Sequence, residues 1–410
     1  MPSPRSRSPL TIIFITIFID LLGFGLVLPA LPFYAESYGA TPFVIGLLSM
    51  SYSLMQFIFS PMWGRISDRV GRRPILLMGL AGSCAAFLIF GLAKSLALLF
   101  VARTLAGILS SASLPTAQAF IADTTTPENR AKGMGLIGAA FGLGFIFGPA
   151  LGGLLTRYGY GFPAIVASIM AGGNFIWAYL RLPESLHHTR RSINPHYLSP
   201  THLKEVFANK RLAFLLGIFF LNVFAFSNME STFALFGEHR IGLNAFGVGA
   251  LLAEVGIIAA VIQGLLIGKL TKKFSEVNLA IAGIMLMCAG LLATTLAYST
   301  LAMVLIVPLY ALGSALTNPT MSALISKSVT ETRQGMTMGA MQGLGALGRV
   351  LGPVAGTGMF QAFSPSAPYE IGSALLAIAG IASWIKLPRL VKQTIGDDPF
   401  AEEENETAQP

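Results

Sequence analysis

The stretch GRISDRVGRRP, residues 64–74, decides the fold class, because it separates two apolar runs that can each cross a lipid bilayer. The runs, at 44–63 and 74–93, have about the twenty residues that a helix needs to span a hydrocarbon core of about 30 Å. The stretch between them is short and carries four arginines and one aspartate. Long apolar runs and short basic segments alternate in the same way along the chain, which predicts an all-α membrane protein.

Ten further apolar runs of spanning length accompany these two, so we predict twelve transmembrane helices. The further runs lie at about 10–34, 96–121, 135–156, 161–181, 212–236, 246–269, 278–298, 301–325, 335–360 and 368–386. No small-residue cleavage site interrupts the first run, so we interpret it as a retained span and not as a signal peptide.

The composition supports a membrane protein, since 54% of the residues are hydrophobic and only 11% are charged, too few charges for the surface of a soluble domain. The two cysteines exclude a disulfide framework and a four-thiolate zinc site. The five histidines are expected in loops, and no catalytic constellation falls within the runs. We therefore expect no metal, no cofactor and no enzymatic activity. The net charge of +8 is spread over short clusters, which argues against nucleic acid as a partner.

The distribution of lysine and arginine predicts the orientation in the membrane. If the N-terminus is inside, only Lys94, Arg157 and Arg240 fall in segments on the outer side, and only Arg103 and Arg349 fall within the runs. All other basic residues face the cytoplasm, as the positive-inside rule requires. We expect a multi-pass protein of the inner membrane with both termini in the cytoplasm.

An internal repeat relates the two halves of the chain at an offset of 204 residues. The matching residues are Gly64 and Gly268, Cys84 and Cys288, Pro115-Thr116 and Pro319-Thr320, Gly148-Pro149 and Gly352-Pro353, and Gly152 and Gly356. The repeat predicts two pseudo-symmetric six-helix bundles with a site between them near the midplane of the membrane. Their predicted bounds are 1–181 and 212–386, with a cytoplasmic linker at 182–211 and a disordered cytoplasmic tail at 387–410.

The stretch at 64–74 resembles the signature loop between helices 2 and 3 of the major facilitator superfamily, and the resemblance extends over nearly the whole chain. It implies a transporter in which this loop latches the two halves together on the cytoplasmic side in the outward-open state. The residues implied in the latch are Gly64, Asp68, Arg69, Arg72, Asp123 and Arg130. The second-half counterpart, GKLTKKF from Gly268, has Lys272 in place of Asp68, so the latch is expected mainly on one side.

The fifth run carries a glycine pattern that favours export. Its members are Gly135, Gly144, Gly148, Pro149, Gly152 and Gly153. Glycines three or four residues apart share a helix face and allow close helix packing, and the proline can kink the helix. The spacing resembles the motif of drug/proton antiporters in this superfamily.

Four further strings resemble tetracycline-type antiporters: IDLLGFGLVLPALP at 19–32, LMQ at 54–56, IADTTTPENR at 121–130 and FGEHR at 236–240. Those antiporters carry an additional aspartate in their third span, where this chain has Ala86. The difference argues against tetracycline itself as the substrate.

Ionisable residues inside the runs are candidates for proton coupling, because a carboxylate at the bilayer centre costs about 2.5–3.5 kcal/mol unless it is paired, protonated or hydrated. Asp20 is the main candidate, and the resemblance implies a proton-coupling role for Arg103; a static Asp20–Arg103 ion pair is the alternative. Glu230 and Glu254 are further candidates, of which we expect Glu254 to lie deeper. Arg349 is expected either to pair with a carboxylate or to bind an anionic substrate group.

Polar residues in the runs are candidates either for the substrate cavity or for cross-links between helices. The candidate cavity residues are Asp20, Gln56, Asn222, Asn228, Glu230, Glu254, Gln263, Asn318, Gln342 and Arg349. Together the observations predict a monomeric, proton-coupled antiporter that exports small hydrophobic or amphipathic compounds. The alternatives are an importer, a metabolite or siderophore exporter of the same fold, and a membrane sensor that transports nothing.

Overall fold

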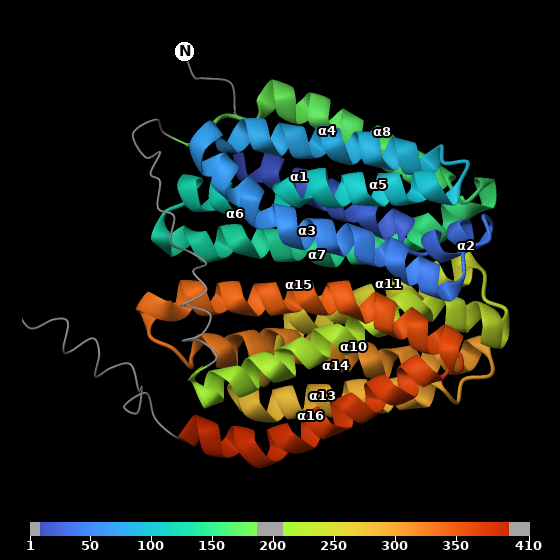
Figure 1. Ribbon diagram of the computed structural model, residues 1–410. Helices are drawn as coiled ribbons and strands as arrows, with labels where there is room; N and C mark the ends of the chain where they lie inside the picture. Colours follow the sequence, from blue (N-terminus) through green and yellow to red (C-terminus); the bar gives the residue numbers. More distant parts are fainter. Residues whose placement is uncertain (1–8, 187–207, 393–410) are drawn as a thin grey trace, which may run out of the picture.

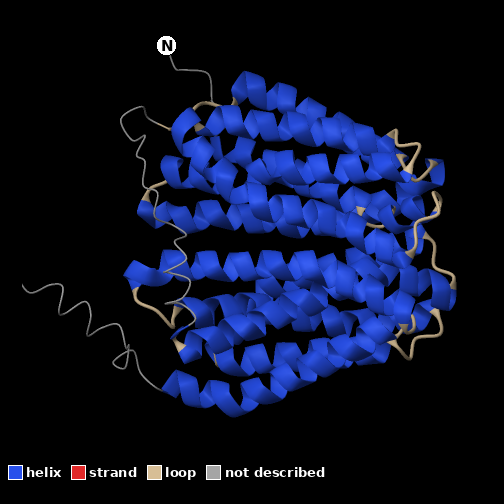
Figure 2. Cartoon of the chain, in the orientation of Figure 1, coloured by secondary structure: helices blue, strands red, loops and turns tan. Residues whose placement is uncertain are grey.

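The computed structural model describes residues 9–186 and 208–392, and in these residues all regular structure is helical (Figure 2). The predicted disordered tail, 387–410, lies outside the described ranges from residue 393 on, and its first residues, 387–392, instead belong to the last helix. Most of the predicted linker also lies outside the described ranges. The all-α prediction is confirmed.

The first half of the chain forms one bundle, drawn in blue to green in Figure 1. Its helices are α1 (Pro9–Val27), α2 (Leu31–Glu36), α3 (Pro42–Val70), α4 (Arg72–Gly91), α5 (Leu96–Leu109), η1 (Ser110–Ala112), α6 (Ser113–Thr124), α7 (Pro127–Leu155), η2 (Thr156–Tyr158) and α8 (Phe162–Arg181). The segments α5, η1 and α6 follow one another without a gap and make the fourth span.

The second half forms the other bundle, drawn in yellow-green to red. Its helices are α10 (Lys210–Ile241), α11 (Ala245–Val261), η4 (Ile262–Leu266, a π-helical segment), α12 (Ile267–Lys273), α13 (Glu276–Thr294), α14 (Thr300–Ser326), α15 (Glu331–Ala362) and α16 (Ala367–Lys392). The segments α11, η4 and α12 make one continuous span.

Eleven helices in the described part of the chain are long and apolar enough to cross a membrane. The twelfth member of the two bundles, α15, has 32 residues but a more polar sequence, rich in glycine and with Gln342 and Arg349 near its middle. It packs against α10 in its own bundle and against α3 in the other. The twelve-helix, two-bundle architecture is therefore confirmed.

Two predicted spans differ from the observed helices. The run at 10–34 is broken, because Pro29 and Pro32 cannot donate backbone hydrogen bonds; α1 ends at Val27 and α2 is a separate short helix. The seventh span continues to Ile241 and is closed by Gly242 at φ 68°, a left-handed conformation that favours glycine. His239 therefore lies in a helix and not in a loop.

The internal repeat is visible as equivalent contacts in the two bundles. In the first, the Ser168 hydroxyl of α8 donates to the Cys84 carbonyl of α4 at 2.8 Å. In the second, the Ser373 hydroxyl of α16 donates to the Cys288 carbonyl of α13 at 3.1 Å. The same cysteine–serine contact thus joins the third span to the sixth and the ninth to the twelfth.

Large apolar side chains cover the outside of the bundles. Ile169, Leu180, Leu265, Leu296 and Trp384 each expose about 70% of their surface, which a soluble protein of this size would not tolerate on many faces at once.

The molecule has a basic end and an α2 end. The basic end is where α3, α6, α8, α12 and α14 finish, and the α2 end is the opposite one (Figure 1).

Candidate transport pathway and latch

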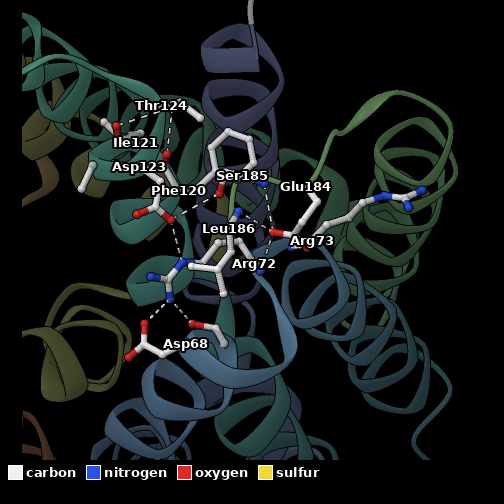
Figure 3. A network of polar contacts seen from close by, with 12 residues as sticks. Asp68, Arg72, Arg73, Phe120, Ile121, Asp123, Thr124, Glu184, Ser185 and Leu186 are labelled. Carbon is white, nitrogen blue, oxygen red and sulfur yellow. Dashed lines mark hydrogen bonds and ion pairs between the residues drawn. The ribbon is translucent and has the colours of Figure 1, made fainter. Parts of the chain in front are cut away.

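The predicted latch forms a charge network around Arg72, at the start of α4 (Figure 3). The Arg72 guanidinium donates through Nε to Asp123 Oδ2 at 3.0 Å, and through Nη1 to Asp68 Oδ1 at 2.5 Å and Ser67 Oγ at 2.7 Å. Only 7% of Arg72 is exposed, so these partners replace the water that a buried guanidinium loses. The network joins α3, α4 and α6.

Glu184, just after α8, completes this network and has no counterpart in the sequence-based prediction. Its carboxylate accepts hydrogen bonds from the backbone N–H groups of Arg72 at 2.9 Å and Arg73 at 3.1 Å, which are free donors at the first turn of α4. Gly71 at φ 122° allows the carboxylate this close, because a Cβ there would lie 2.5 Å from Glu184 Oε2. The end of the first bundle is thereby tied to the signature loop.

The other predicted latch residues stand apart from the network. The Arg69 side chain is exposed, Arg130 Nη2 donates to the Ala122 carbonyl at 3.3 Å, and no atom lies within 4 Å of a Cβ built on Gly64. Both ion pairs of the network, Arg72–Asp68 and Arg72–Asp123, lie within the first bundle.

The α2 end is closed by close contact between the bundles. A Cβ on Gly46 of α3 would overlap Thr357 Oγ1 and lie 2.8 Å from the Pro353 carbonyl, both in α15. Nearby, the backbone N–H of Phe43 donates to Gln361 Oε1 at 3.0 Å. Since helix backbones approach this closely only where a side chain is missing, Gly46 is the contact point between α3 and α15.

The glycine pattern of α7 serves two packing faces. Gly144, Gly148 and Gly152 lie against the backbone of α1, where a Cβ on Gly148 would be 2.7 Å from Gly25 Cα. Gly153 instead faces the second bundle, where a Cβ on it would be 3.0 Å from Phe246 Cα in α11. Gly135, at the other end of the pattern, has no neighbour within 4 Å. One face therefore builds the first bundle, and the other closes the α2 end.

Toward the basic end the helices pack less closely. No atom lies within 4 Å of a Cβ built on several glycines in the parts of α3, α7, η4, α12 and α15 nearest this end. These glycines are Gly64, Gly135, Gly138, Gly264, Gly268, Gly335, Gly339 and Gly343. The described chain is thus closed at the α2 end and more loosely packed at the basic end.

Arg103 lies in α5 without an ion-pair partner. Its guanidinium carbon is 4.5 Å from the centre of the Tyr52 ring and 6.0 Å from that of Phe24. The residue is 8% exposed, and its Nε is buried without an acceptor. The ring faces of Tyr52 and Phe24 supply a cation–π contact but no hydrogen bond.

Asp20 is not paired with Arg103 in this conformation, so the static ion pair considered above is not formed. Asp20 Oδ1 accepts a hydrogen bond from the Ser83 hydroxyl of α4 at 2.9 Å. The Ser113 hydroxyl lies close by and has no other partner. The carboxyl group is therefore held by hydroxyl groups and not by a cation.

Glu230 of α10 brings a negative charge to the place where the bundles meet. The charges that act on it are those of Arg349 in its own bundle and Arg103 in the other, although neither forms an ion pair with it. We refer to Tyr52, Arg103, Glu230 and Arg349 as the central cluster. Neither arginine is among the groups that act on Glu254, and the expectation that Glu254 is the deeper of the two glutamates stays a prediction.

The remaining candidate cavity residues divide by their exposure. Gln56 Nε2 donates to the Tyr52 hydroxyl at 3.5 Å, next to the central cluster, and Gln342 and Arg349 expose their side chains on one face of α15. Gln263 and Asn318 are also exposed. Asn222 and Asn228 are buried, and their amide groups donate to the carbonyls of Ile218 and Pro368 in the same bundle.

Two carboxyl groups, one from each bundle, meet at the α2 end. Glu36 closes α2 and lies within hydrogen-bonding reach of Glu238 in α10, whose Oε2 is buried without another partner. Two carboxyl groups can share a hydrogen bond only if one is protonated. Burial and the Glu238 carboxyl raise the pKa of Glu36 from its ordinary value of 4.5 to about 7.

This contact is expected to make closure of the α2 end depend on pH. Because the pKa of Glu36 is raised in the closed form, the contact contributes below its ordinary pKa and is lost as the pH rises through about 7. Spin labels at the exposed positions Ser37 and Phe363 should therefore move apart between pH 6 and pH 8, measured by double electron–electron resonance. Glu36→Gln, which donates at every pH, should abolish this shift, whereas Glu370→Gln at the same end should not. A shift that persists in Glu36→Gln would assign the pH dependence to another group.

Two similar bundles of membrane-spanning helices with a charged cluster between them are typical of a multi-pass membrane transporter. The model of the Major Facilitator Superfamily matches residues 13–353 and 255–407, so this chain belongs to that superfamily. The predicted family is confirmed, and the relatives below are transporters of the same superfamily and not enzymes.

Known relatives cover nearly the whole chain. Multidrug resistance protein 1 of Bacillus subtilis is 31% identical over 92% of this chain and 96% of its own length. Tetracycline resistance protein class C of Escherichia coli is 31% identical over 87% and 91%. The crystal structure of the human organic anion transporter MFSD10 (TETRAN) has a TM-score of 0.70 and 25% identity, and covers 93% of this chain and all of its own.

Proposed function

We propose that this protein exports small hydrophobic or amphipathic compounds in exchange for protons, by alternating access. The observation that carries the proposal is the combination of a closed α2 end, looser packing at the basic end and unpaired charges from both bundles between them. A substrate bound between the bundles would leave at the α2 end once the contacts at Gly46 and Gly153 had broken.

The sidedness of the proposal follows from the basic residues. Lysine and arginine concentrate at the basic end, which the positive-inside rule assigns to the cytoplasm. With that assignment the conformation described here is inward-facing, and both termini are cytoplasmic in the inner membrane of the cell. We propose that the monomer is the working unit, and that protons, with no other cofactor, provide the coupling.

Export is favoured over import by two features. Gly153 of the α7 glycine pattern makes a contact that closes the α2 end, and the names of two relatives refer to drug and tetracycline resistance. The buried Ala86, in place of the carboxylate of tetracycline antiporters, supports a substrate other than tetracycline. The driving force is adequate, because a charge moving down 100 mV releases about 2.3 kcal/mol.

Purified protein in liposomes tests the proposed exchange. A candidate compound should release protons from liposomes loaded with acid only when the protein is present, and a pH gradient should drive the compound in the opposite direction to the protons. An importer coupled by symport would instead move both in the same direction, which would reject antiport. Absence of any substrate-dependent proton movement with a broad panel of amphipathic compounds would reject proton coupling.

A further inference from the structure

Two arginines, one from each bundle, share one carboxylate in the central cluster. Arg103 and Arg349 both act on Glu230. Asp20 is held by Ser83 and acts on Tyr52 of the cluster, but neither arginine is among the groups that act on Asp20. Glu230 is therefore the carboxylate that the two guanidinium groups have in common.

Arg103 has hydrogen-bonding capacity that the protein does not use. It is more than nine-tenths buried, its Nε has no acceptor, and none of its nitrogens makes a hydrogen bond to another described residue. A buried donor without a partner costs about 1–3 kcal/mol, and more when it is charged. The guanidinium is a planar fork that fits a carboxylate, sulfonate or phosphate group. The unused donor is what a site for an anionic ligand group would show before the ligand binds.

Arg349 is reachable from the space between the bundles. It lies near the middle of α15, yet its side chain is exposed, and its charge acts on Tyr52 of the first bundle as well as on Glu230 of its own. An exposed side chain at this depth must face the space between the bundles and not the lipid, because its electrostatic neighbours lie on both bundles. A ligand entering from the basic end would meet Arg349.

Aromatic rings beside the arginines can take the apolar part of such a ligand. Phe24 is 5.4 Å from Tyr52 and 6.4 Å from Phe145, measured between ring centres, and the three rings come from α1, α3 and α7. In the second bundle, Phe226 stacks on Tyr310 at 6.0 Å. Rigid rings beside two cations suit a compound with an aromatic body and an acidic group.

We infer that the substrate of the proposed exporter is an amphipathic organic anion whose acidic group binds between Arg103 and Arg349. The inference rests on the proposed function and narrows its substrate class. Glu230 is common to the two arginines, and the unused donors of Arg103 remain for one acidic group of the ligand. A cationic compound would place its charge beside two guanidinium groups, and is disfavoured by Coulomb repulsion at that depth.

A matched series of compounds tests the charge preference. Naphthylacetate, naphthylacetamide and naphthylethylamine share one aromatic body and differ in the charge of the side group. In proteoliposomes with a pH gradient, naphthylacetate should compete with a transported substrate at a concentration at least tenfold lower than naphthylacetamide does. Naphthylethylamine should be the weakest competitor. Equal or better competition by the amine would overturn the inference.

Variants of Arg349 connect the preference to the site. Arg349→Gln should weaken competition by naphthylacetate at least tenfold and leave that of the amide unchanged, while Arg349→Lys should retain part of the preference. Arg157→Gln removes an exposed arginine at the α2 end. It should change neither the competition by naphthylacetate nor that by the amide. An unchanged carboxylate preference in well-folded Arg349→Gln, as judged by monodisperse elution, would overturn the inference.

The membrane potential separates failure of this inference from failure of the proposed function. In a one-for-one exchange with a proton, export of an anion moves one more charge than export of a neutral compound, which changes the accumulation ratio by about fiftyfold at 100 mV. If proton exchange occurs only with neutral or cationic compounds, the proposed function stands and the anionic substrate class falls. If neither the naphthyl series nor cationic drugs exchange with protons, both the proposed function and the anionic substrate class are rejected.

Discussion

Replacing Asp20 with asparagine is expected to abolish accumulation driven by a pH gradient. The asparagine side chain would still accept the hydrogen bond from Ser83 but could not bind or release a proton, so the conformational cycle would lose its coupling ion. At zero membrane potential, one pH unit can sustain an accumulation ratio of up to about tenfold for one proton per substrate. In Asp20→Asn this ratio should fall to about one, measured with labelled substrate in proteoliposomes.

Two controls separate coupling from folding. Ser83→Ala removes the hydroxyl donor at 2.9 Å from Asp20 and keeps the carboxyl group, so coupling should persist with a changed pH profile. Glu254→Gln removes a carboxyl group of the spans that has no charged neighbour, and accumulation should stay close to that of the unaltered protein. Gradient-driven accumulation retained in Asp20→Asn, or lost equally in Glu254→Gln, would show that another group carries the proton.

Replacing Gly46 with valine is expected to shift the protein out of the conformation described here. A Cβ at this position overlaps Thr357 Oγ1, which is itself fixed by donating to the Pro353 carbonyl at 2.7 Å. Relief by rotation of Thr357 is therefore costly, and the bundles would have to separate at the α2 end. Overpacking of this kind costs about 1–3 kcal/mol, which corresponds to a shift of about five- to a hundredfold in the ratio of closed to open forms.

Distances across the α2 end measure this shift. Labels at Ser37 and Phe363, in protein from which Cys84 and Cys288 have been removed, should show a longer distance in Gly46→Val, and transport should be strongly reduced. Gly173→Val is the control, because this exposed glycine of α8 has no atom within 4 Å of a Cβ. If the distance in Gly46→Val matched that of the control, α3 and α15 would not form the contact that closes this end.

The sequence predicted the charge network of Asp68, Arg72 and Asp123, because the interacting groups are close in the chain or belong to a specific motif. That this network latches the two halves together stays a prediction. Asp68 and Arg72 are four residues apart, and Asp123 follows the next span but one. Glu184 was missed, since a carboxylate that accepts from the first N–H groups of a helix is recognisable only when the chain is known to return to that helix. The sequence signal for this role of Glu184 was weak, because it consists of a single glutamate after Pro183 at the end of a span.

The central cluster was predicted only as a list of polar residues in the spans. The sequence identified Asp20, Arg103, Glu230 and Arg349 as unusual, but it gave Arg103 as the partner of Asp20, and this pair is not formed in the conformation described here. The cause is that a helix in a membrane is apolar on its lipid side and on its packing side, so hydrophobic periodicity does not reveal which face a polar residue occupies. Tyr52 and Ser83 escaped notice for the same reason.

The amino-acid sequence by itself determined the number of spans, their grouping into two similar halves and the charge network of the signature loop, since hydrocarbon thickness and the cost of burying charge act on local composition. Only the tertiary structure decided which charges face one another between the bundles, that Glu36 meets Glu238, and which end is closed. Those features depend on the rotation and tilt of whole helices, and close backbone contacts such as Gly46 against Thr357 set these over distances that no local pattern records.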